Sequence, residues 1–404
     1  MVPDAPGPVA PGPATSGLTA VAMSGGLDSS VVAWLLAQEG QPVVGLSMLL
    51  WDRSDEVSNG RCCGALDLGD AKRVAQQAGI PHYTLRMDQE FREKVVDPFV
   101  GDYLAGRTPS PCVACNTWIK FDLLWQKARA FGAEKLATGH YARIVAGPEG
   151  PELHTATNPE KDQSYYLFEL SAEQLAASQF PLGELTKTRV RELAREAGLA
   201  VAEKGESMEV CFVAGGIREF VESEAAAAPE RFKILTHRDA PNGEPAAFGT
   251  PAILVDREGN ELGRGEPYYR YTVGQRRGLG LSSANRLYVL RIEPEANRVV
   301  VGSDEELFAR GLTAERLHWI GPPPEGADRG VEATVKIRSR HPGVTARIVS
   351  LPGGRAEVEF ETPQRGVAPG QAAVFYRGTR VLGGCWITGE LLPRNPGTQG
   401  VALG

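Results

Sequence analysis

The stretch Thr19-Ala-Val-Ala-Met-Ser-Gly-Gly-Leu-Asp-Ser29 decides the fold of this chain. Its apolar first half predicts a strand, and residues 30–39 repeat apolar side chains at helical spacing before Gly40, which is placed to end a helix. We expect Asp28 or Ser29 to cap the first turn of that helix. A strand that runs through two glycines into a helix directs backbone N–H groups and the positive end of the helix dipole at one point. The stretch therefore predicts a phosphate site.

The polar side chains of this loop narrow the kind of phosphate site. Ser24, Asp28 and Ser29 supply two hydroxyls and a carboxylate, which suit a pyrophosphate with Mg²⁺ near Asp28. The loop lacks the Gly-Lys-Ser/Thr of a Walker loop and the three-glycine spacing of dinucleotide folds. For the glycine pair alone, a tight turn without a ligand is the alternative. The whole loop resembles Ser-Gly-Gly-x-Asp-Ser, the pyrophosphate loop of ATP pyrophosphatases, which implies cleavage of ATP between its α and β phosphates.

Composition sets the class of protein. The chain has 404 residues, a net charge of −7 and six cysteines, which predict two or three soluble domains in a reducing cytoplasm. No apolar run is long enough to cross a bilayer, so we expect no membrane association. The negative net charge argues against a protein that coats nucleic acid over its whole surface, but it is compatible with a local basic groove.

Strands and helices alternate through the first half, which predicts an α/β doubly wound parallel sheet. Gly106–Asn116 reads as a polar, proline-marked loop, followed by a helix over 118–131. Past about residue 216, short alternating runs with Gly- and Asn-containing turns predict two small β domains, the last barrel-like. The expected division is a disordered tail (1–17), an ATP-binding catalytic domain (18–215), a central β domain (216–296), a β-barrel-like domain (297–393) and a tail (394–404).

The cysteines divide into a pair and single residues. Cys112 and Cys115 form C-x-x-C in the polar loop, and Cys211 stands alone in Lys204–Val213. Structural zinc would require a second C-x-x-C knuckle, which the sequence lacks. A buried structural thiol suits Cys385, between two glycines and a tryptophan, better than it suits the pair. We assign no role to the adjacent cysteines at 62 and 63.

Six motifs together resemble the tRNA-specific 2-thiouridylase family, and they span nearly the whole folded chain. They are Ala22–Ser29, Gly106–Asn116, Ala137–Arg143, Lys161–Ser164, Thr272–Gly280 and Pro369–Tyr376. The resemblance implies thiolation of the wobble uridine in tRNAs for Lys, Glu and Gln. ATP adenylates the 2-oxygen of the uracil, and a persulfide sulfur then displaces AMP.

The resemblance also assigns the cysteines. Cys211 would carry the persulfide, received from a sulfur-relay donor protein of the cysteine desulfurase pathway. Cys115 would be the nucleophile that attacks it, freeing sulfide or closing a disulfide with Cys211. A thiolate is the attacking species in either case.

The binding residues come from the same resemblance. The implied ATP contacts are Ala22, Met23, Ser24, Gly25, Gly26, Leu27, Asp28, Ser29, Met48 and Gly139. The implied tRNA contacts are His140, Lys161, Asp162, Gln163, Arg338, Ser339 and Gln371, with Ser110, Pro111 and Cys112 as the target-base loop. Local chemistry leaves alternatives open here: a buried, satisfied histidine at 140, a solvated ion pair at 161–162, and an outward strand face at Arg338.

Departures from the family pattern leave the sulfur carrier open. Cys112 stands where many members have an Asp proposed for acid–base work, and Ser110 and Ser339 replace a usual Asn and a frequent Tyr. Cys112, Cys115 and Cys211 are also three thiols that would suit a 4Fe–4S cluster with one open iron to carry sulfide. Persulfide and cluster both remain as interpretations.

Two other functions compete. A pyrophosphate-loop ligase or amidotransferase would need an amine-donor site and no paired cysteines. A non-catalytic RNA-binding module would carry a vestigial nucleotide loop, against which the intact Ser24–Ser29 loop argues. We expect a thiouridylase whose β domains bind tRNA, with an affinity that falls as the salt concentration rises.

Overall fold

The computed structural model describes residues 17–50, 65–205, 210–213, 215–232, 248–282 and 285–390. The expectations for both tails and for the cysteines at 62 and 63 lie outside these residues. The chain forms two compact units, which are described separately. The first comprises Met1–Arg92, Cys115–Ser164 and Leu170–Phe212, and the second Glu93–Ala114, Tyr165–Glu169 and Val213–Gly404.

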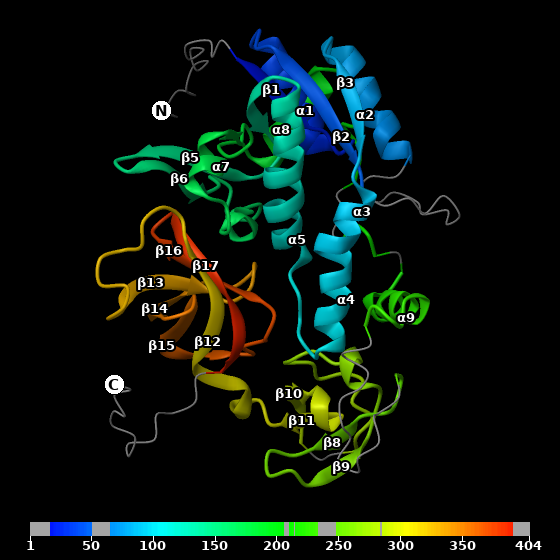
Figure 1. The fold of residues 1–404 in the computed structure, drawn as a ribbon, viewed down its shortest axis with the longest axis vertical. Helices are drawn as coiled ribbons and strands as arrows, with labels where there is room; N and C mark the ends of the chain where they lie inside the picture. Colours follow the sequence, from blue (N-terminus) through cyan, green and yellow to red (C-terminus); the bar gives the residue numbers. More distant parts are fainter. Residues whose placement is uncertain are drawn as a thin grey trace, which may run out of the picture. The chain divides into compact units, whose positions relative to one another are not determined.

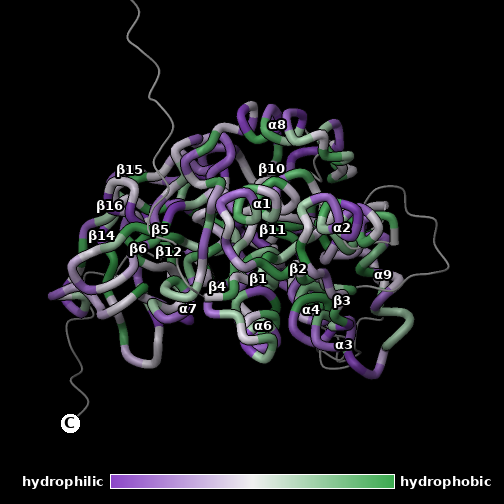
Figure 2. Tube along the Cα trace, turned by 90° about the horizontal axis from the view of Figure 1, so that it is seen from above, coloured by the Kyte–Doolittle hydropathy of each residue, from purple (hydrophilic) through white to green (hydrophobic). Residues whose placement is uncertain are grey.

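The first unit is built on a parallel sheet, as the alternating pattern predicts. Its strands run in the order β3-β2-β1-β4-β7, and each neighbouring pair is parallel. They are β1 (Leu18–Ala22), β2 (Val43–Leu49), β3 (His82–Arg86), β4 (Ala133–Ala137) and β7 (Ser178–Gln179). Helices α1 (Leu27–Gln38) and α2 (Ala65–Ala78) lie on one side of β1 and β2, and α6 (Trp125–Ala130) lies on the other (Figures 1 and 2). This arrangement confirms a doubly wound α/β fold.

Helix α1 packs its apolar side into the core of the first unit, where Val31, Val32 and Leu36 are buried. It contacts α8 (Lys187–Glu196), whose Val190 joins the same core. The expected capping by Asp28 or Ser29 is wrong. Gly26 is the N-cap, without a side-chain cap, because Ser29 accepts the Ser24 N–H and Asp28 binds Lys187.

The cysteine region differs from the expected loop. Pro111–Ala114 forms α5, Cys115–Leu124 forms the π-helix η2, and α6 continues from it. Proline suits the first position of a helix because its missing N–H has no helical partner there. Val113 also donates its N–H to the Ser110 carbonyl at 3.1 Å, which closes the first turn. The helix therefore starts before the cysteines rather than at 118.

The remaining elements before the β region are short. A hairpin pairs β5 with β6, and helical segments precede and follow it. Their bounds are β5 (Ala142–Gly147), β6 (Gly150–Thr155), α3 (Asp88–Phe91), η1 (Arg92–Val96), α4 (Asp97–Leu104), η3 (Ser164–Leu167), α7 (Ala172–Ala176) and α9 (Ile217–Ala227).

The second unit contains a small sheet in the order β10-β11-β8-β9. Leu254, Val289 and Val299 are buried in its core. Because β11 pairs with both β10 and β8, this sheet extends past residue 296, where the sequence suggests a domain boundary. The elements are β8 (Ile253–Val255), β9 (Glu261–Arg264), η4 (Tyr268–Arg270), β10 (Tyr288–Glu293), η5 (Pro294–Ala296), β11 (Arg298–Gly302) and η6 (Glu305–Leu307).

A closed antiparallel barrel follows in the second unit and confirms the barrel-like expectation. Strand β12 pairs with β15 on one side and with β17 on the other, which closes the ring. The barrel strands are β12 (Phe308–Trp319), β13 (Val331–Lys336), β14 (Val344–Leu351), β15 (Arg355–Arg365), β16 (Ala372–Arg377) and β17 (Arg380–Glu390). Cys385 is buried inside the barrel with Val335 and Phe375. None of the helices described is long and apolar enough to span a membrane.

Candidate functional site: a pyrophosphate loop with cysteines and lysines

The loop Ser24–Ser29 is held by its own hydroxyls. Ser24 donates its N–H to Ser29 Oγ at 3.1 Å, and Gly26 donates its N–H to Ser24 Oγ at 3.4 Å. Gly25 has φ +75°, and a Cβ there would lie 2.0 Å from the Asp67 carbonyl oxygen. Only glycine therefore fits at this position, both for its backbone angle and for its close approach to α2.

Gly139 joins the loop from the neighbouring strand end. A Cβ at Gly139 would lie 2.9 Å from the Ser29 nitrogen, so the segment after β4 packs directly on the start of α1. Met48 is buried near the carboxyl end of β2, next to β1 in the sheet. Ligands of open α/β sheets bind beyond this edge. The geometry is that of a nucleotide site, and the individual ATP contacts remain predictions.

Asp28 is the centre of a polar contact between three elements. Lys187 Nζ donates to both carboxylate oxygens of Asp28, at 2.8 and 2.9 Å, and the Tyr141 hydroxyl donates to Oδ1 at 2.8 Å. Lys187 is the first residue of α8, and its side chain is 14% exposed. The pyrophosphate loop thus has a nearly buried cation in contact with its acid.

A second lysine binds the other side of the loop. Lys204 Nζ donates to the Gly25 carbonyl at 2.9 Å, to Asp67 Oδ1 at 2.5 Å and to Asp70 Oδ2 at 2.6 Å. Burial opposes the charged form of Lys204, but its two carboxylate partners outweigh this and raise its pKa. Burial also opposes ionisation of Asp70, whereas Lys204 and Arg73 together hold the pKa of Asp70 below its usual value. Lys204 is therefore a fixed cation bridging α2 and the loop.

Two cysteines described in the first unit, Cys115 and Cys211, lie on segments that contact α3. Cys115 is the first residue of η2, which contacts α3, and it is half-buried. Cys211 is half-buried too, and the next residue, Phe212, packs its ring on Phe91 of α3 with centroids 5.5 Å apart. The segments that carry these cysteines therefore meet on one short helix.

His140 lies inside the first unit rather than on its surface. The ring is 9% exposed and packs between Phe121 and Phe180. Nδ1 and Nε2 lie 2.8 Å from Thr138 Oγ1 and 3.4 Å from Lys120 Nζ. Burial, with a smaller contribution from Lys120, holds the pKa of His140 well below its usual value, so the ring is neutral. This geometry favours the buried, satisfied histidine over a direct tRNA contact.

The polar residues 161–163 also serve the fold. Asp162 accepts hydrogen bonds from the Ala156 and Ser164 N–H groups at 3.0 and 3.2 Å. Gln163 accepts the Tyr141 N–H at 2.9 Å. Both side chains brace the turn that precedes η3, and Lys161 is half-buried beside them.

In the second unit, the barrel holds the expected target-base loop. Gln371 Nε2 donates to the carbonyls of Thr108 and Pro109 at 2.9 and 3.3 Å, and Thr108 donates its N–H to the Pro369 carbonyl at 2.8 Å. A Cβ at Gly370 would lie 3.0 Å from Thr108 backbone atoms. The Gln371 side chain therefore fixes the approach to Ser110, Pro111 and Cys112.

Tyr166 lies close to two residues of the expected tRNA-binding set, Ser339 and Cys112. Its hydroxyl hydrogen-bonds to Ser339, and it lies near Cys112 and Arg340. Burial, aided by Cys112, raises the pKa of this phenol above its usual value, although Ser339 acts in the opposite direction. Cys112 is exposed. Arg338 is also exposed and donates to the Arg365 carbonyl at 3.3 Å.

Metal ligands can be tested against these contacts. In the described ranges, no group of three or more His, Cys, Asp or Glu side chains is placed to hold a metal. A 4Fe–4S cluster needs three thiolates gathered at one point, and no such group stands among the described residues. Asp28, whose carboxylate is 32% exposed, fits Mg²⁺ that also takes phosphate oxygens and waters as ligands.

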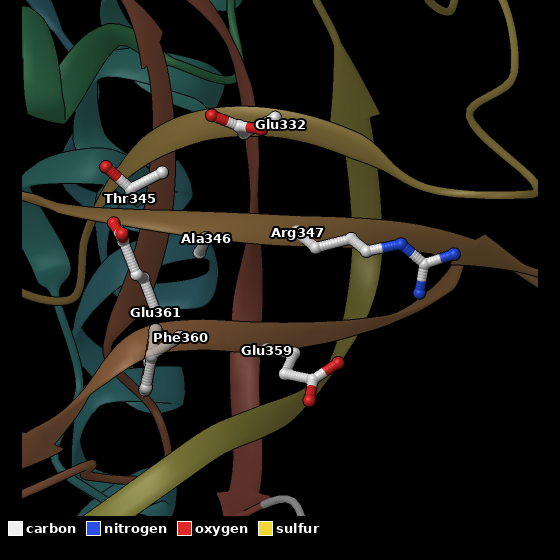
Figure 3. A pocket seen from close by; sticks show the side chains of 7 residues that line it. All are labelled: Glu332, Thr345, Ala346, Arg347, Glu359, Phe360 and Glu361. Atoms are coloured by element: carbon white, nitrogen blue, oxygen red, sulfur yellow. The ribbon is translucent and has the colours of Figure 1, made fainter.

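An acidic pocket lies on the outer face of the barrel, with a volume of about 440 Å³. Figure 3 shows Arg347 and Glu359, from neighbouring strands, extending toward the same side of it. Glu332 and Glu361 line it as well. Three carboxylates against one guanidinium repel phosphate, so this face does not suit RNA.

Sequence reasoning missed Lys187, Lys204 and Tyr166. For Lys187, the sequence does carry a signal: a threonine before an amphipathic run predicts a helix that begins at the next residue. Thr186 is indeed the N-cap of α8 and accepts the Arg189 N–H. Lys204 has no local signal, since its partners lie more than 130 positions earlier in the chain.

Comparisons with known proteins agree with this architecture. Residues 18–215 match the family model described as tRNA methyl transferase HUP domain. Residues 250–303 match the tRNA methyl transferase PRC-barrel domain, and residues 309–387 the aminomethyltransferase beta-barrel domain.

Curated relatives match over nearly their whole length. The tRNA-specific 2-thiouridylase MnmA of Geobacter metallireducens is 48% identical over 91% of this chain and 95% of its own. Those of Geotalea uraniireducens and Solibacter usitatus are 46% and 45% identical, each over 91% of this chain, and over 94% and 98% of their own. The chain therefore belongs to the tRNA-specific 2-thiouridylase family.

Proposed function

We propose that this protein 2-thiolates the wobble uridine of tRNA at the expense of ATP. The observation that carries the proposal is that one unit contains both the pyrophosphate loop and two segments that carry cysteines. The loop binds Lys204, seven residues before Cys211, while α3 contacts both Phe212 and the π-helix that begins at Cys115. An ATP site and two thiols in one unit suit activation of a substrate oxygen followed by attack of sulfur.

The first step is adenylation. The uracil 2-oxygen attacks the α-phosphorus of ATP, the α–β bond breaks, and pyrophosphate leaves. The amides of Ser24–Ser29 and the start of α1 bind the polyphosphate. Lys187 neutralises its negative charge. Asp28 would hold Mg²⁺, which would supply further positive charge at the pyrophosphate.

The second step is sulfur transfer. The terminal sulfur of a Cys211 persulfide attacks C2 of the activated ring, and AMP leaves with the oxygen. The Cys115 thiolate then attacks the Cys211 sulfur, which breaks the S–S bond, leaves sulfur on C2 and closes a Cys115–Cys211 disulfide. A reductant of the dithiol class restores both thiols.

The second unit supplies the tRNA-binding surface in this proposal. The loop Ser110–Cys112, held by Gln371, receives the target base. Tyr166 and Ser339 lie near Cys112 of this loop. Arg338 contacts a phosphate. His140, Lys161, Asp162 and Gln163, in the first unit, maintain the local fold. The sulfur donor is a persulfide-carrying protein of the cytoplasm.

The test is a reconstituted reaction with the full chain, tRNA, Mg-ATP and a persulfide donor. Pyrophosphate and 2-thiouridine are measured together. We expect tRNA-dependent pyrophosphate release in the wild type and in Cys211→Ser, and 2-thiouridine only in the wild type. Cys385→Ser, inside the barrel, is the matched control and should still thiolate. Pyrophosphate release without tRNA, or amination of a substrate, would favour the ligase function instead.

A further inference from the structure

The proposed reaction gives no role to the motif Thr272–Gly280, which we call the arginine loop. A hollow of about 390 Å³ lies between the second half of this loop and the approach to β10, within the second unit. Arg276 and Arg286 line it together with glycines, leucines and an asparagine, and no acidic side chain is among the described residues that line it. Its charge is therefore opposite to that of the glutamate-lined pocket in Figure 3.

The arginines around this hollow are not neutralised. Arg276 and Arg286 are exposed, and so is Arg277. Within the part of the chain that the structure describes, none of these three guanidinium groups makes an ion pair or a hydrogen bond. The other arginines of residues 250–303 each pair with a glutamate: Arg257, Arg264, Arg270, Arg291 and Arg298. Unpaired positive charge is therefore concentrated at one loop of a chain whose net charge is −7.

The arginine loop is held in place on the small sheet. Leu279 is 6% exposed and belongs to the same core as Val289. Val289 also donates its N–H to the Gln275 carbonyl at 2.9 Å. The Gln275 side chain accepts the Thr272 N–H at 3.2 Å and donates to the Arg277 carbonyl at 2.9 Å. The backbone that carries the arginines is thus ordered before any ligand binds, which lowers the entropy that binding must offset.

Two glycines leave the backbone of the loop open to a ligand. Gly278 and Gly280 have φ +77° and +70°, which favour glycine over other residues. A Cβ at Gly280 would meet no described atom within 4 Å, and a Cβ at Gly278 would meet only Gln275 Nε2, at 3.8 Å. The space in front of these glycines allows a phosphate group to approach the main chain closely.

The chemistry of the hollow suits phosphate. The planar fork of an arginine donates two parallel hydrogen bonds to phosphate oxygens, and unpaired guanidinium groups are free to do so. Because both arginines are exposed, the site suits a phosphate chain that passes across it. A free nucleotide, by contrast, binds where most of its surface becomes buried.

We propose that Arg276 and Arg286 bind the sugar-phosphate backbone of tRNA and make no contact with the target base. The inference rests on the proposed function, in which tRNA is the substrate. Arg277 adds to the positive potential of the same loop. Since phosphate contacts carry no sequence information, this site contributes affinity that substrate and non-substrate tRNAs share.

The experiment measures tRNA binding by the full chain at several salt concentrations, without ATP or persulfide. The double variant Arg276→Gln with Arg286→Gln should reduce the slope of log affinity against log salt concentration by about 2. It should weaken binding of substrate and non-substrate tRNAs by the same factor. Replacing both residues with lysine keeps the charges and should keep most of the slope. Arg264→Gln is the matched control, because Arg264 is 65% exposed but pairs with Glu261, and this variant should leave the slope unchanged.

The possible outcomes distinguish this inference from the proposed function. An unchanged salt slope in the double glutamine variant overturns the phosphate site, even when the wild type thiolates tRNA. A loss of affinity confined to substrate tRNAs overturns it too, because the contact would then depend on bases. The proposed function fails separately, when the wild type binds tRNA but forms no 2-thiouridine with Mg-ATP and a persulfide donor.

Two other occupants of the hollow give different results. If the double variant binds tRNA normally but loses binding of inorganic phosphate, the site takes a free anion and the inference is wrong. Thiolation is also compared with a low-molecular-weight persulfide and with a donor protein. If tRNA binding is unchanged and thiolation falls only with the donor protein, the loop binds that protein, which equally overturns the inference.

Discussion

Lys187 Nζ, in the first turn of α8, lies 2.8 and 2.9 Å from the two carboxylate oxygens of Asp28 in the pyrophosphate loop, and the two residues form an ion pair. The pair joins residues 159 positions apart and brings a cation to the place where polyphosphate is expected. Because phosphate oxygens compete with the carboxylate for the same ammonium, we infer that Lys187 exchanges Asp28 for ATP phosphates, which would leave the Asp28 carboxylate available to hold Mg²⁺.

Replacing Lys187 should therefore lower the catalytic efficiency for ATP and have less effect on the free energy of unfolding. In Lys187→Met we expect the catalytic efficiency for ATP in tRNA-dependent pyrophosphate release to fall by roughly 100-fold, the usual scale for a lost charge-stabilising donor. Lys135→Met, on β4 away from this loop, is the control. A Lys187 variant with wild-type ATP kinetics would remove this residue from the mechanism.

Gln371 should act on the loop that it holds. In Gln371→Ala the carbonyls of Thr108 and Pro109 lose their donor, and we expect kcat for thiolation to fall about tenfold through loss of position. The KM for ATP should stay constant, because the ATP loop belongs to the other unit. Gln126→Ala, at an exposed side chain on α6, is the comparison. Loss of ATP affinity in Gln371→Ala would contradict the assignment.

The buried His140 predicts a pH dependence of stability. Its pKa is depressed in the folded chain, so between that value and 6.5 the unfolded chain binds more protons. Stability is fully present above pH 6.5 and falls as the pH drops toward the folded pKa. The His140 contribution to this slope is at most about 1.4 kcal/mol per pH unit. Denaturant unfolding between pH 7 and 5 should show a shallower loss in His140→Gln, and an identical slope would contradict a neutral buried ring.

The charge on the barrel surface predicts which arginine binds RNA. Arg338→Ala should weaken tRNA binding and reduce the slope of log affinity against log salt concentration by about 1. Arg347→Ala should do neither, since Arg347 lies in the glutamate-lined pocket of Figure 3. Filter binding at several salt concentrations measures both. Equal effects of the two variants would show that the barrel does not bind tRNA through Arg338.

The parts of the fold that depend on local sequence could be predicted. The run from Thr19 to Gly40 encodes strand, loop and helix within one short segment, and the parallel sheet follows from the alternation of strands and helices. The sequence does not predict the helix through Cys112 and Cys115, because a proline such as Pro111 fits a polar loop as well as the first position of a helix.

The polar contacts of the site depend on the tertiary fold and were beyond prediction. Lys204, Lys187 and Gln371 bind partners more than 100 positions away, and no spacing rule encodes such pairs. His140 shows the converse. Its motif implied a tRNA contact, whereas packing against Phe121 and Phe180 gives it a place in the interior. A motif identifies the residues, and burial decides which of them reach a substrate.

The sulfur carrier is the central claim, and a single-turnover reaction tests it most directly. The protein is purified without iron, loaded with one persulfide at Cys211, and mixed with Mg-ATP and tRNA in the absence of further donor. We predict up to one 2-thiouridine per chain, together with a disulfide between Cys115 and Cys211. No 2-thiouridine from the persulfidated, iron-free protein, with activity restored only when iron and sulfide are bound, would contradict the persulfide mechanism.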